Sequence, residues 1–529
     1  MPYAVVIGLS ALLLFAIEPM TVKYLLPWFG GSSEVWATSL LFFTVLLFLG
    51  YVYVYFLSKR PLRQQPIIHF YVIVVAVCFT LFSLYQWHSI YPPLDWMIGD
   101  MTPPVFNVFK ALLLAIGAPF FLLSTTGPLL QYWYGISTRK EPYILYALSN
   151  AVSLLALAGY IFIIEPYSTL SSQSTVWVGL FLVYAAANIF ILVRFYRNAN
   201  TYAAKSPLAR PKNEAVHRVS MRRRMTWVWY GALPAFMLTA TTVEITQSIA
   251  PVPLLWVVPL MIYLLAFVFA FSGKGQSIWM PLLLLGGSFF VYSSAISPLN
   301  IVWVIVVYLG LLFFCSLVCG ARAYRLRPDT PLLPLFYLFL SLGGMVGTLC
   351  ASIAAPIIFT DFWEFSLGIA LSAGMAVYLL DELFFPRILD IRKILLAKIL
   401  CMAVITYLFF GILSADDGHV SVRARNFYGS VKVQFGAGWT TLMHGTTLHG
   451  IQISDPEHRY APTTYYGPHS GVGRSITYER GVRKGKGIRV GNIGLGVGTM
   501  AAYCRAGDTF VFYDIDPHVA DLARRYFSY

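Results

Sequence analysis

Three glycines and one aspartate near the end of the chain have the spacing of a nucleotide-binding loop. In GIRVGNIGLGVGTMAAY, residues 487–503, Gly494, Gly496 and Gly498 lie between an apolar run and a small-residue run. Residues without a Cβ let the backbone approach a ligand, and a following helix would offer free N–H groups. Asp514 follows Gly494 by twenty residues, the spacing at which an acidic side chain accepts from ribose hydroxyls. We predict a nucleoside-cofactor site; the alternative is a Gly-rich turn that binds nothing.

Four polar residues upstream of this loop form a second candidate group. His449 and Gln452 lie in HGTTLHGIQ, and Tyr465 and Tyr466 lie in PTTYYGPHSGVG. They either line a pocket for an acceptor substrate or are ordinary side chains of strands. Histidines are dense in this region, but no Cys or paired carboxylate accompanies them at a ligand spacing, so we expect no metal site. No catalytic residue is assigned.

The composition places these motifs on a membrane protein. Hydrophobic residues make up 58% of the 529-residue chain and charged residues only 11%, which lies outside the range of soluble proteins. The net charge of +14 comes from Lys and Arg in short loops between apolar runs, where they act as topology signals. We therefore expect the lipid bilayer as a partner and exclude nucleic acid. The oligomeric state is not predicted.

Apolar runs long enough to span a bilayer occur thirteen times, in two groups. The fourth contains Pro119 and Gly127 and is expected to be kinked or broken. A run with nine basic residues separates the groups, which predicts a first membrane half at 1–193, a basic cytoplasmic linker at 194–226 and a second membrane half at 227–413. The expected spans are 3–20, 35–57, 66–87, 106–133, 143–164, 172–193, 227–248, 254–272, 278–297, 301–319, 332–354, 366–380 and 394–412.

The basic loops predict an N-terminus in the cytoplasm, in the inner or plasma membrane of the cell. Basic loop residues recur on the side of the linker, whereas the opposite loops are acidic. Thirteen spans would then leave the C-terminal segment outside, where a cytoplasmic metabolite is absent. One span can be miscounted. The sequence therefore predicts twelve to fourteen membrane helices and does not decide on which side of the membrane the C-terminal segment lies.

Polar residues inside the predicted spans are functional candidates because burying a polar side chain in lipid costs free energy. Glu244 and Gln247 share one helical face, and Asn150 belongs to a similar stripe in the fifth span. These stripes either line a path for a cationic solute or hydrogen-bond neighbouring helices. Glu18 and Glu165 each precede a proline, which indicates a weak repeat, and both either act in function or lie at the membrane interface.

After Ser414 the composition changes to short runs of β-branched and aromatic residues between Gly and Asp turns. We predict a β-rich segment at 414–486 and the beginning of a Rossmann-like α/β domain at 487–529. A small-residue sequence, GGMVG at 343–347, predicts a close contact between two membrane helices.

IGLGVGT followed by YDIDPHVADLARRYF resembles the first two motifs of spermidine synthases, and HGTTLHGIQ resembles a membrane-fused, spermidine synthase-like family. The segments IEPMTVKYLLPWFGGSSEVW and PVPLLWVVPLMIYLLAFVFAF resemble the family's transporter-like, MFS-like membrane part. The resemblance implies S-adenosylmethionine (AdoMet) or its decarboxylated form as cofactor. The three glycines would face its amino-acid moiety, Asp514 its ribose, and Asp516 would support the turn.

The chain also departs from the family. Val497 stands where soluble aminopropyltransferases carry Asp, and Tyr465, Tyr466 and Gly467 replace a Tyr-His-Glu motif. The catalytic acidic loop of the family comes after the second strand, so the sequence is interpreted as truncated at Tyr529 and inactive by itself.

The sequence thus predicts an α-helical polytopic membrane protein followed by a small β-rich segment and an incomplete Rossmann-like domain. Its predicted function is transfer of an aminopropyl or alkyl group from AdoMet or decarboxylated AdoMet to a small-molecule amine. The alternatives are a multi-pass transporter for a polyamine or other cationic solute, with a non-catalytic nucleoside-sensing tail, and a structural membrane scaffold.

Overall fold

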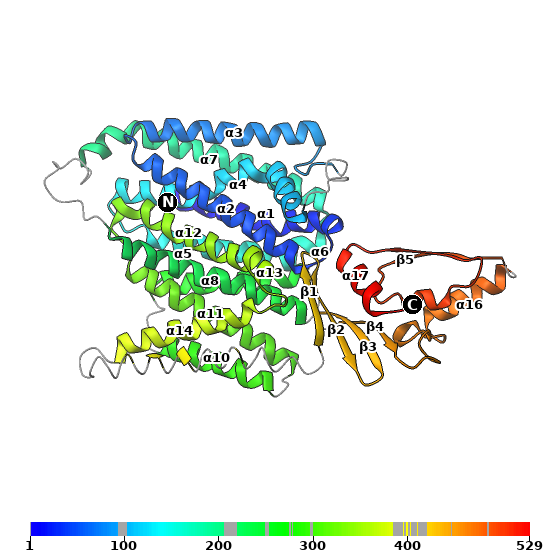
Figure 1. Ribbon diagram of the computed structural model, residues 1–529. Helices are drawn as coiled ribbons and strands as arrows, with labels where there is room; N and C mark the ends of the chain where they lie inside the picture. The colour runs from blue at the N-terminus through cyan, green and yellow to red at the C-terminus, as the bar shows by residue number, and fades with distance from the viewer. Residues whose placement is uncertain are drawn as a thin grey trace. The chain divides into compact units, whose positions relative to one another are not determined.

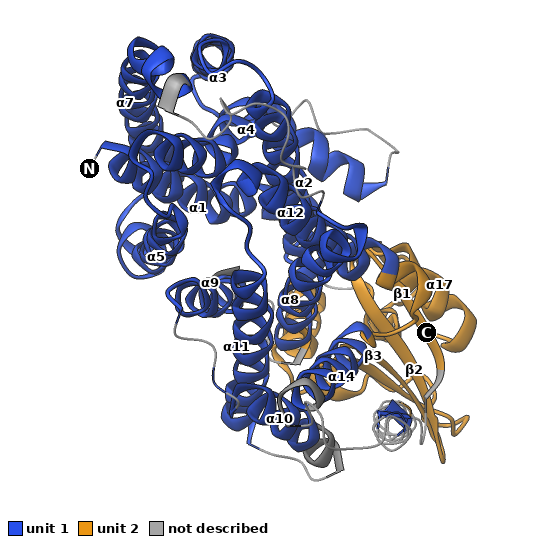
Figure 2. Ribbon diagram, turned by 90° about the vertical axis from the view of Figure 1, so that its left-hand side faces the viewer, with its two compact units in different colours: residues 1–246, 251–354, 364–409 blue, residues 247–250, 355–363, 410–529 orange. Residues whose placement is uncertain are grey.

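The protein folds into two compact units (Figure 2). Unit 1 comprises residues 1–246, 251–354 and 364–409, and unit 2 comprises residues 247–250, 355–363 and 410–529. The computed structural model describes residues 2–93, 103–205, 219–248, 253–273, 277, 279–296, 300–384, 395, 398–399, 402–403, 410, 420–445, 447–483 and 486–529.

Unit 1 is a bundle of long helices (Figure 1). In the described ranges, eight helical segments are long and apolar enough to cross a membrane, and three shorter ones are apolar. The protein is therefore an integral membrane protein. The helices are α1 Pro2–Phe29, α2 Ser33–Ser58, α3 Gln64–Trp87, α4 Pro104–Thr138, α5 Tyr143–Gly159, α6 Glu165–Tyr167, α7 Leu170–Lys205, α8 Met221–Ser248, α9 Val257–Phe271, α10 Trp279–Ile296, α11 Ile301–Arg325, α12 Leu333–Leu349 and α14 Glu364–Phe384.

The predicted spans agree with these helices up to residue 384, and the span predicted at 394–412 lies mostly outside the described residues. The fourth span was expected to be kinked or broken; it is not broken, because α4 is one continuous helix through Pro119 and Pro128. A proline removes only one backbone N–H, and neighbouring helices and Ser or Thr side chains compensate for it in a membrane helix.

The helices pack in the same pattern in two successive halves of unit 1. In the first half, α2 packs on α4, and α3 packs on α4 and α7; in the second, α9 packs on α11, and α10 packs on α11 and α14. The halves meet through two further pairs, α2 with α12 and α5 with α9. The order of the helices makes these pairs equivalent, since α2 corresponds to α9 and α5 to α12. Unit 1 is therefore an internal repeat of six helices.

Two π-helical breaks occur at equivalent places in this repeat. The 17-residue α5 continues into a π turn at Tyr160–Ile164, and the 17-residue α12 continues into a π turn at Cys350–Ala354. Each turn is followed by a short helix with a proline, Pro166 or Pro356, and both the turns and the prolines are 190 residues apart (350 − 160 and 356 − 166). π turns inside α-helices are rare and often mark functional places.

Glycines bring α8 and α12 into backbone contact, as GGMVG predicts. A Cβ on Gly343 would lie 2.1 Å from the carbonyl oxygen of Val228, and one on Gly347 would lie 2.1 Å from that of Ala232. From the other side, a Cβ on Gly231 would lie 2.2 Å from the carbonyl oxygen of Leu340. Small residues are needed where membrane helices touch this closely.

Unit 2 begins, in its described C-terminal part, with a four-stranded antiparallel sheet in the order β1-β2-β3-β4. The strands are β1 Val420–Asn426, β2 Gly429–Gly436, β3 Trp439–His444 and β4 Thr447–Ile453, joined by tight turns that use Gly438 and Gly445 at positive φ. One face of the sheet supplies Val431, Val433 and Leu442 to a core. The same core receives Val497, Val519, Leu522 and Phe527.

The last strands form a separate two-stranded parallel sheet, β5 Arg489–Ile493 and β6 Thr509–Tyr513, followed by α17 Pro517–Tyr526. A five-residue 3-10 turn, Thr499–Tyr503, stands where a Rossmann-like domain would begin its first helix. Ile493 is 98% exposed, whereas parallel sheets normally bury both faces. The structure therefore shows a strand-turn-strand-helix unit and, within the described residues, no Rossmann domain.

The contact between α8 and α12 gives a first testable prediction. Gly343→Ala should destabilise unit 1 by about 1–3 kcal/mol, because the added methyl group cannot fit against the backbone of Val228. Gly344→Ala is the matched control, since a Cβ there meets no atom within 4 Å. The midpoint of heat-induced aggregation in detergent, followed by size exclusion, measures the difference. Equal midpoints for the two variants would contradict the close contact.

Candidate functional site

A cavity of about 190 Å³ lies inside unit 1 between the two repeated halves. Its walls come from α1, α2, α4 and α5 of the first half and from α8, α9 and α12 of the second. Four of these helices, α2, α5, α9 and α12, also form the contacts between the halves. Ligand sites of membrane transporters typically lie at such repeat interfaces. This cavity is the candidate functional site.

Glu18 is the only charged residue among the described residues that line this cavity. It ends a stripe on α1 that begins at Ile7 and follows the helical period through Ser10, Ala11 and Leu14. The Glu18 side chain is 4% exposed, and its Oε2 atom has no hydrogen-bond partner in the described structure. A buried carboxylate oxygen without a partner is costly, which makes Glu18 a functional candidate.

Aromatic side chains form much of the wall around the carboxylate. The rings of Tyr146 and Tyr337 stack with centroids 5.6 Å apart, and Tyr51 lies 6.1 Å from Tyr337. Tyr146 and Tyr337 come from equivalent helices of the two halves, so this stack connects α5 to α12. Eight aromatic residues line the cavity: Phe15, Phe43, Tyr51, Phe120, Tyr146, Tyr263, Phe267 and Tyr337.

The neutral polar side chains of the cavity mostly bond to nearby groups. Asn150 Nδ2 donates to the carbonyl oxygen of Tyr146 at 2.9 Å, and Ser153 Oγ donates to that of Ser149 at 2.9 Å. Tyr337 donates its hydroxyl to Gln131 Oε1 at 2.5 Å, across the two halves. Glu18 thus differs from its neighbours in having a lone pair directed at no protein donor.

The polar stripes predicted from sequence divide between the two units. Asn150 lines the cavity, as does Tyr146 one turn earlier. Glu244 is half-buried on α8 and is not part of the cavity wall, and Gln247 belongs to unit 2. There, the Gln247 side-chain oxygen lies 2.8 Å from the position that a Cβ on Gly445 would occupy. The structure therefore brings Asn150, but neither Glu244 nor Gln247, to the cavity.

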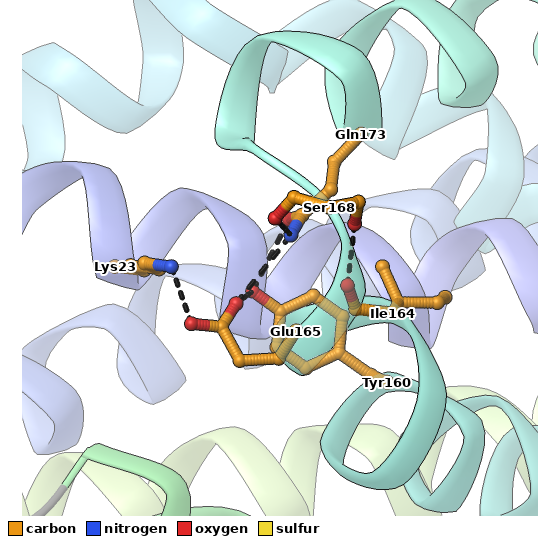
Figure 3. Close-up of polar contacts among 6 residues, drawn as sticks. All are labelled: Lys23, Tyr160, Ile164, Glu165, Ser168 and Gln173. Atoms are coloured by element: carbon orange, nitrogen blue, oxygen red, sulfur yellow. Dashed lines mark hydrogen bonds and ion pairs between the residues drawn. The ribbon is translucent and has the colours of Figure 1, made fainter.

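The second Glu-Pro motif has a different environment from the first (Figure 3). Glu165 forms an ion pair with Lys23 of α1 and accepts a hydrogen bond from Tyr160 of the π turn at 3.0 Å. Gln173 Nε2 of α7 also lies 3.4 Å from the Glu165 carboxylate. Glu165 is thus fully compensated and ties three helical segments together, which leaves Glu18 as the cavity carboxylate.

The Gly-rich loop in unit 2 has the backbone geometry that the sequence predicts. Gly494, Gly496 and Gly498 all have positive φ, at 91°, 56° and 85°. Only glycine adopts this region without strain. Val497 is buried between them, and a Cβ on Gly450 would lie 2.4 Å from its Cγ2. Val497 is therefore a core residue here, which accounts for an apolar side chain where a ligand-binding Asp would otherwise stand.

Asp514 and Asp516 stabilise the loops next to these glycines. Asp514 accepts from the backbone N–H of Leu495 at 2.8 Å and from that of Asp516 at 2.9 Å. Asp516 caps α17 by accepting from the N–H of His518 at 2.9 Å. Asn426 of β1 also donates to Asp516 Oδ1 at 2.5 Å. Each carboxylate thus has a structural role: Asp514 holds the Gly-rich loop, and Asp516, which was expected to support the turn, caps α17.

Three of the four predicted pocket residues approach the Gly-rich loop or one another. A Cβ on Gly496 would lie 2.9 Å from the carbonyl oxygen of His449 and 3.8 Å from the Tyr466 hydroxyl, which is within 3.3 Å of the Tyr465 hydroxyl. Burial and the neighbouring His444 lower the pKa of His449. Gln452 instead bonds to Ser528 and is buried, so it ties β4 to the chain after α17.

The described residues contain no group of three or more His, Cys, Asp or Glu side chains arranged to hold a metal ion. The cavity residues that the sequence analysis did not select include three tyrosines, Tyr51, Tyr263 and Tyr337. Their sequence context is that of ordinary apolar helices, and only the packing of the two halves shows that they share a cavity.

No family model and no curated protein matches the chain. Among solved structures, the chain is similar to the MFS (major facilitator superfamily) proton:xylose symporter XylE bound to 6-bromo-6-deoxy-D-glucose. The match has 12% identity and a TM-score of 0.44, and it covers 72% of this chain and 95% of that chain. A double tryptophan mutant of XylE matches at 13% identity and a TM-score of 0.44, with 71% and 95% covered. A likeness this distant says nothing about the substrate.

The assignment to the membrane-fused spermidine synthase-like family is wrong. No family model or curated protein supports it. The motif that suggested the family is a Gly-rich turn followed by a 3-10 turn, and its Val497 side chain belongs to the core. Glycines at positive φ are required by such a turn whatever the family.

The Asp508 carboxylate, which joins β5, β6 and α16 (Gly471–Arg483), gives a second testable prediction. It accepts from the backbone N–H groups of Ile488 at 2.9 Å and Arg505 at 2.8 Å, and these bonds, helped by Arg480, lower its pKa. A lowered pKa stabilises the fold above the unfolded-state value of about 3.9, and this stabilisation is lost as the pH falls through the folded-state value.

Asp508→Asn should therefore speed amide hydrogen exchange of β5 and β6 at pH 7, relative to the wild-type protein. The difference should shrink at pH 3, because this pH is below the unfolded-state pKa and part of the stabilisation by the charge is already lost. The exposed Asp521→Asn is the control. Mass spectrometry with correction for the intrinsic exchange rate measures both. An equal difference between variant and wild type at the two pH values would refute the role of the charge.

Proposed function

We propose that the protein is a membrane transporter that carries a small solute with a cationic group through the cavity between its two halves. The proposal rests on one observation, the buried Glu18 carboxylate. One of its oxygens has no hydrogen-bond partner in the protein, and no cationic side chain occurs among the described residues that line the cavity. A cationic group on a solute would supply the missing partner.

The aromatic wall supports the same class of solute. Tyrosine and phenylalanine faces attract ammonium groups, and this attraction grows when water is excluded. Tyr146 and Tyr337 come from opposite halves, so a cation held between Glu18 and these rings would contact both. A solute that bridges two halves can change the equilibrium between their arrangements, which is the requirement for transport.

The π turns support movement of the same helices. The turns at Tyr160–Ile164 and Cys350–Ala354 follow directly after α5 and α12, which line the cavity. A break in regular hydrogen bonding at equivalent places in each half allows the ends of both helices to bend. Alternating access in repeat transporters arises from such equivalent movements around a fixed site.

Exchange of a labelled cation tests this function. In proteoliposomes without a pH gradient, wild-type protein should exchange external labelled tetraethylammonium, choline or putrescine for the same internal cation. Glu18→Gln should weaken apparent affinity by roughly 10- to 100-fold, or about 1.4–2.8 kcal/mol, because the neutral amide no longer attracts the charge of the cation. Glu244→Gln is the matched control, because Glu244 lies outside the cavity wall. Exchange of a neutral hexose in place of every cation would contradict the proposal.

We also propose that unit 2 binds a nucleoside-containing ligand at the Gly-rich loop, with AdoMet and decarboxylated AdoMet as candidates. The three glycines at positive φ support this, because they keep the loop open beside His449 and Tyr466. Asp514 already accepts two backbone N–H groups, so only its remaining lone pairs can reach a ribose. This second function is that of a sensor of the transporter, and no catalytic residue is assigned to it.

Isothermal titration of the full chain in detergent tests the nucleoside site. Gly496→Val should abolish binding of either nucleoside, because its side chain would meet the His449 backbone at a positive φ of 56°. Gly471→Ala is the control, since a Cβ there meets no atom within 4 Å. Binding that is unchanged in Gly496→Val, or absent from the wild type, would rule the site out.

A further inference from the structure

The cavity offers one negative charge to any ligand. Of its described lining residues only Glu18 carries a charge, and no Lys, Arg or His faces it there. We propose that Glu18 binds the cation and a proton in turn, so that the transporter exchanges one proton for each cation bound. This inference rests on the proposed function and adds the coupling ion to it.

The titratable groups around Glu18 leave no second proton carrier in the cavity. From the helices that pack on α1, Tyr51 of α2 and Tyr146 of α5 face the cavity, and α4 contributes the neutral Gln131. Tyr184 of α7 bonds instead to Thr126 and Asn188. The opposite half contributes Tyr263 and Tyr337. Tyrosine hydroxyls keep their protons at physiological pH, so only the carboxyl group of Glu18 exchanges one there.

Another carboxylate of the first half, that of Glu165, is already neutralised. Glu165 pairs with Lys23, which lies five residues after Glu18 on α1, and it accepts from Tyr160. This pair carries no net charge and needs no ligand. The charge balance of the cavity therefore depends on the occupant of Glu18 alone.

The exchange follows from the cost of an uncompensated charge at membrane depth. With a cation bound, the Glu18 carboxylate is paired; with a proton bound, it is a neutral acid; with neither, the cavity holds a bare charge. With a cation or a proton bound to Glu18, the cavity can change from facing one side of the membrane to facing the other. With neither bound, this change is strongly disfavoured because the carboxylate charge is uncompensated. The cation leaves as Glu18 takes a proton from the same side, and the proton leaves on the opposite side as the next cation binds.

This balance fixes the stoichiometry and the electrical behaviour. One carboxylate holds one proton or one monovalent cation, so each cycle moves one positive charge in each direction. Exchange of a monovalent cation should therefore be driven by a pH gradient and should not respond to a membrane potential. A dication would leave one positive charge unbalanced and would respond to the potential.

Proton release on binding is the direct test. Tetraethylammonium is the probe, because it carries a permanent charge and no exchangeable proton. Purified wild-type protein in weakly buffered detergent at a pH where Glu18 is protonated should release one proton for each tetraethylammonium bound. Glu18→Gln should release none, and Glu18→Asp should restore the release with a shifted pH dependence. A Lys23→Gln, Glu165→Gln double variant removes the neutral ion pair and should release the proton as the wild type does.

The outcomes separate this inference from the proposed function. Binding of labelled tetraethylammonium without proton release, or a release unchanged in Glu18→Gln, would overturn the exchange and leave cation transport intact. Absence of binding of tetraethylammonium, choline and putrescine would overturn both. In proteoliposomes, uptake driven by an inside-acid pH gradient and indifferent to a potassium diffusion potential would support the exchange. Uptake that follows the potential alone would overturn it.

Discussion

The membrane part of this protein depends on one constraint: a polar group in hydrocarbon must find its partner inside the protein. Most groups do so locally, as Asn150 does with the carbonyl oxygen of Tyr146. Glu165 does so over a longer distance through its ion pair with Lys23. Among the described residues that line the cavity, Glu18 is the exception, because its Oε2 is buried and has no hydrogen-bond partner. The proposed function supplies that partner from outside the protein.

The internal repeat explains why this exception lies where it does. Two equivalent six-helix halves meet through α2 with α12 and α5 with α9, and the cavity lies among these helices. The glycines of α8 and α12 allow those helices to approach each other closely beside the cavity. The paired π turns then give α5 and α12 equivalent places at which to bend. Together, a fixed site, close helix packing and equivalent bending places in both halves would allow the cavity to open to each side of the membrane in turn.

The helices could be predicted from the sequence because a helix that spans lipid needs a long apolar run, and such runs can be recognised directly in the sequence. Pro119 does not break α4, and the π turns before Pro166 and Pro356 were not predicted. The sequence showed that Asn150 and Glu18 are polar residues in predicted spans, but it could not show that they share a cavity with Tyr337. That proximity depends on packing between residues 187 positions apart (337 − 150) and 319 positions apart (337 − 18) in the chain.

The Gly-rich loop shows the opposite limit of sequence analysis. Its three glycines predicted the backbone conformation correctly, because positive φ follows from the residue type. The family suggested by the same motif was wrong, since Val497 packs in the core and Asp514 accepts backbone N–H groups. A motif therefore determined local geometry here, while the surrounding contacts determined what each side chain does. The prediction of a cytoplasmic N-terminus depends on loop charges and stays a prediction.

The most direct test of the account is the chemical reactivity of Glu18 itself. Dicyclohexylcarbodiimide, an apolar reagent, modifies carboxyl groups in membranes, and mass spectrometry of the peptides locates the product. The account predicts modification at Glu18 that falls as tetraethylammonium is added, while Glu165, already paired with Lys23, reacts little under either condition. Modification of Glu18 that is indifferent to tetraethylammonium, choline and putrescine alike would contradict the claim that this carboxylate binds the transported cation.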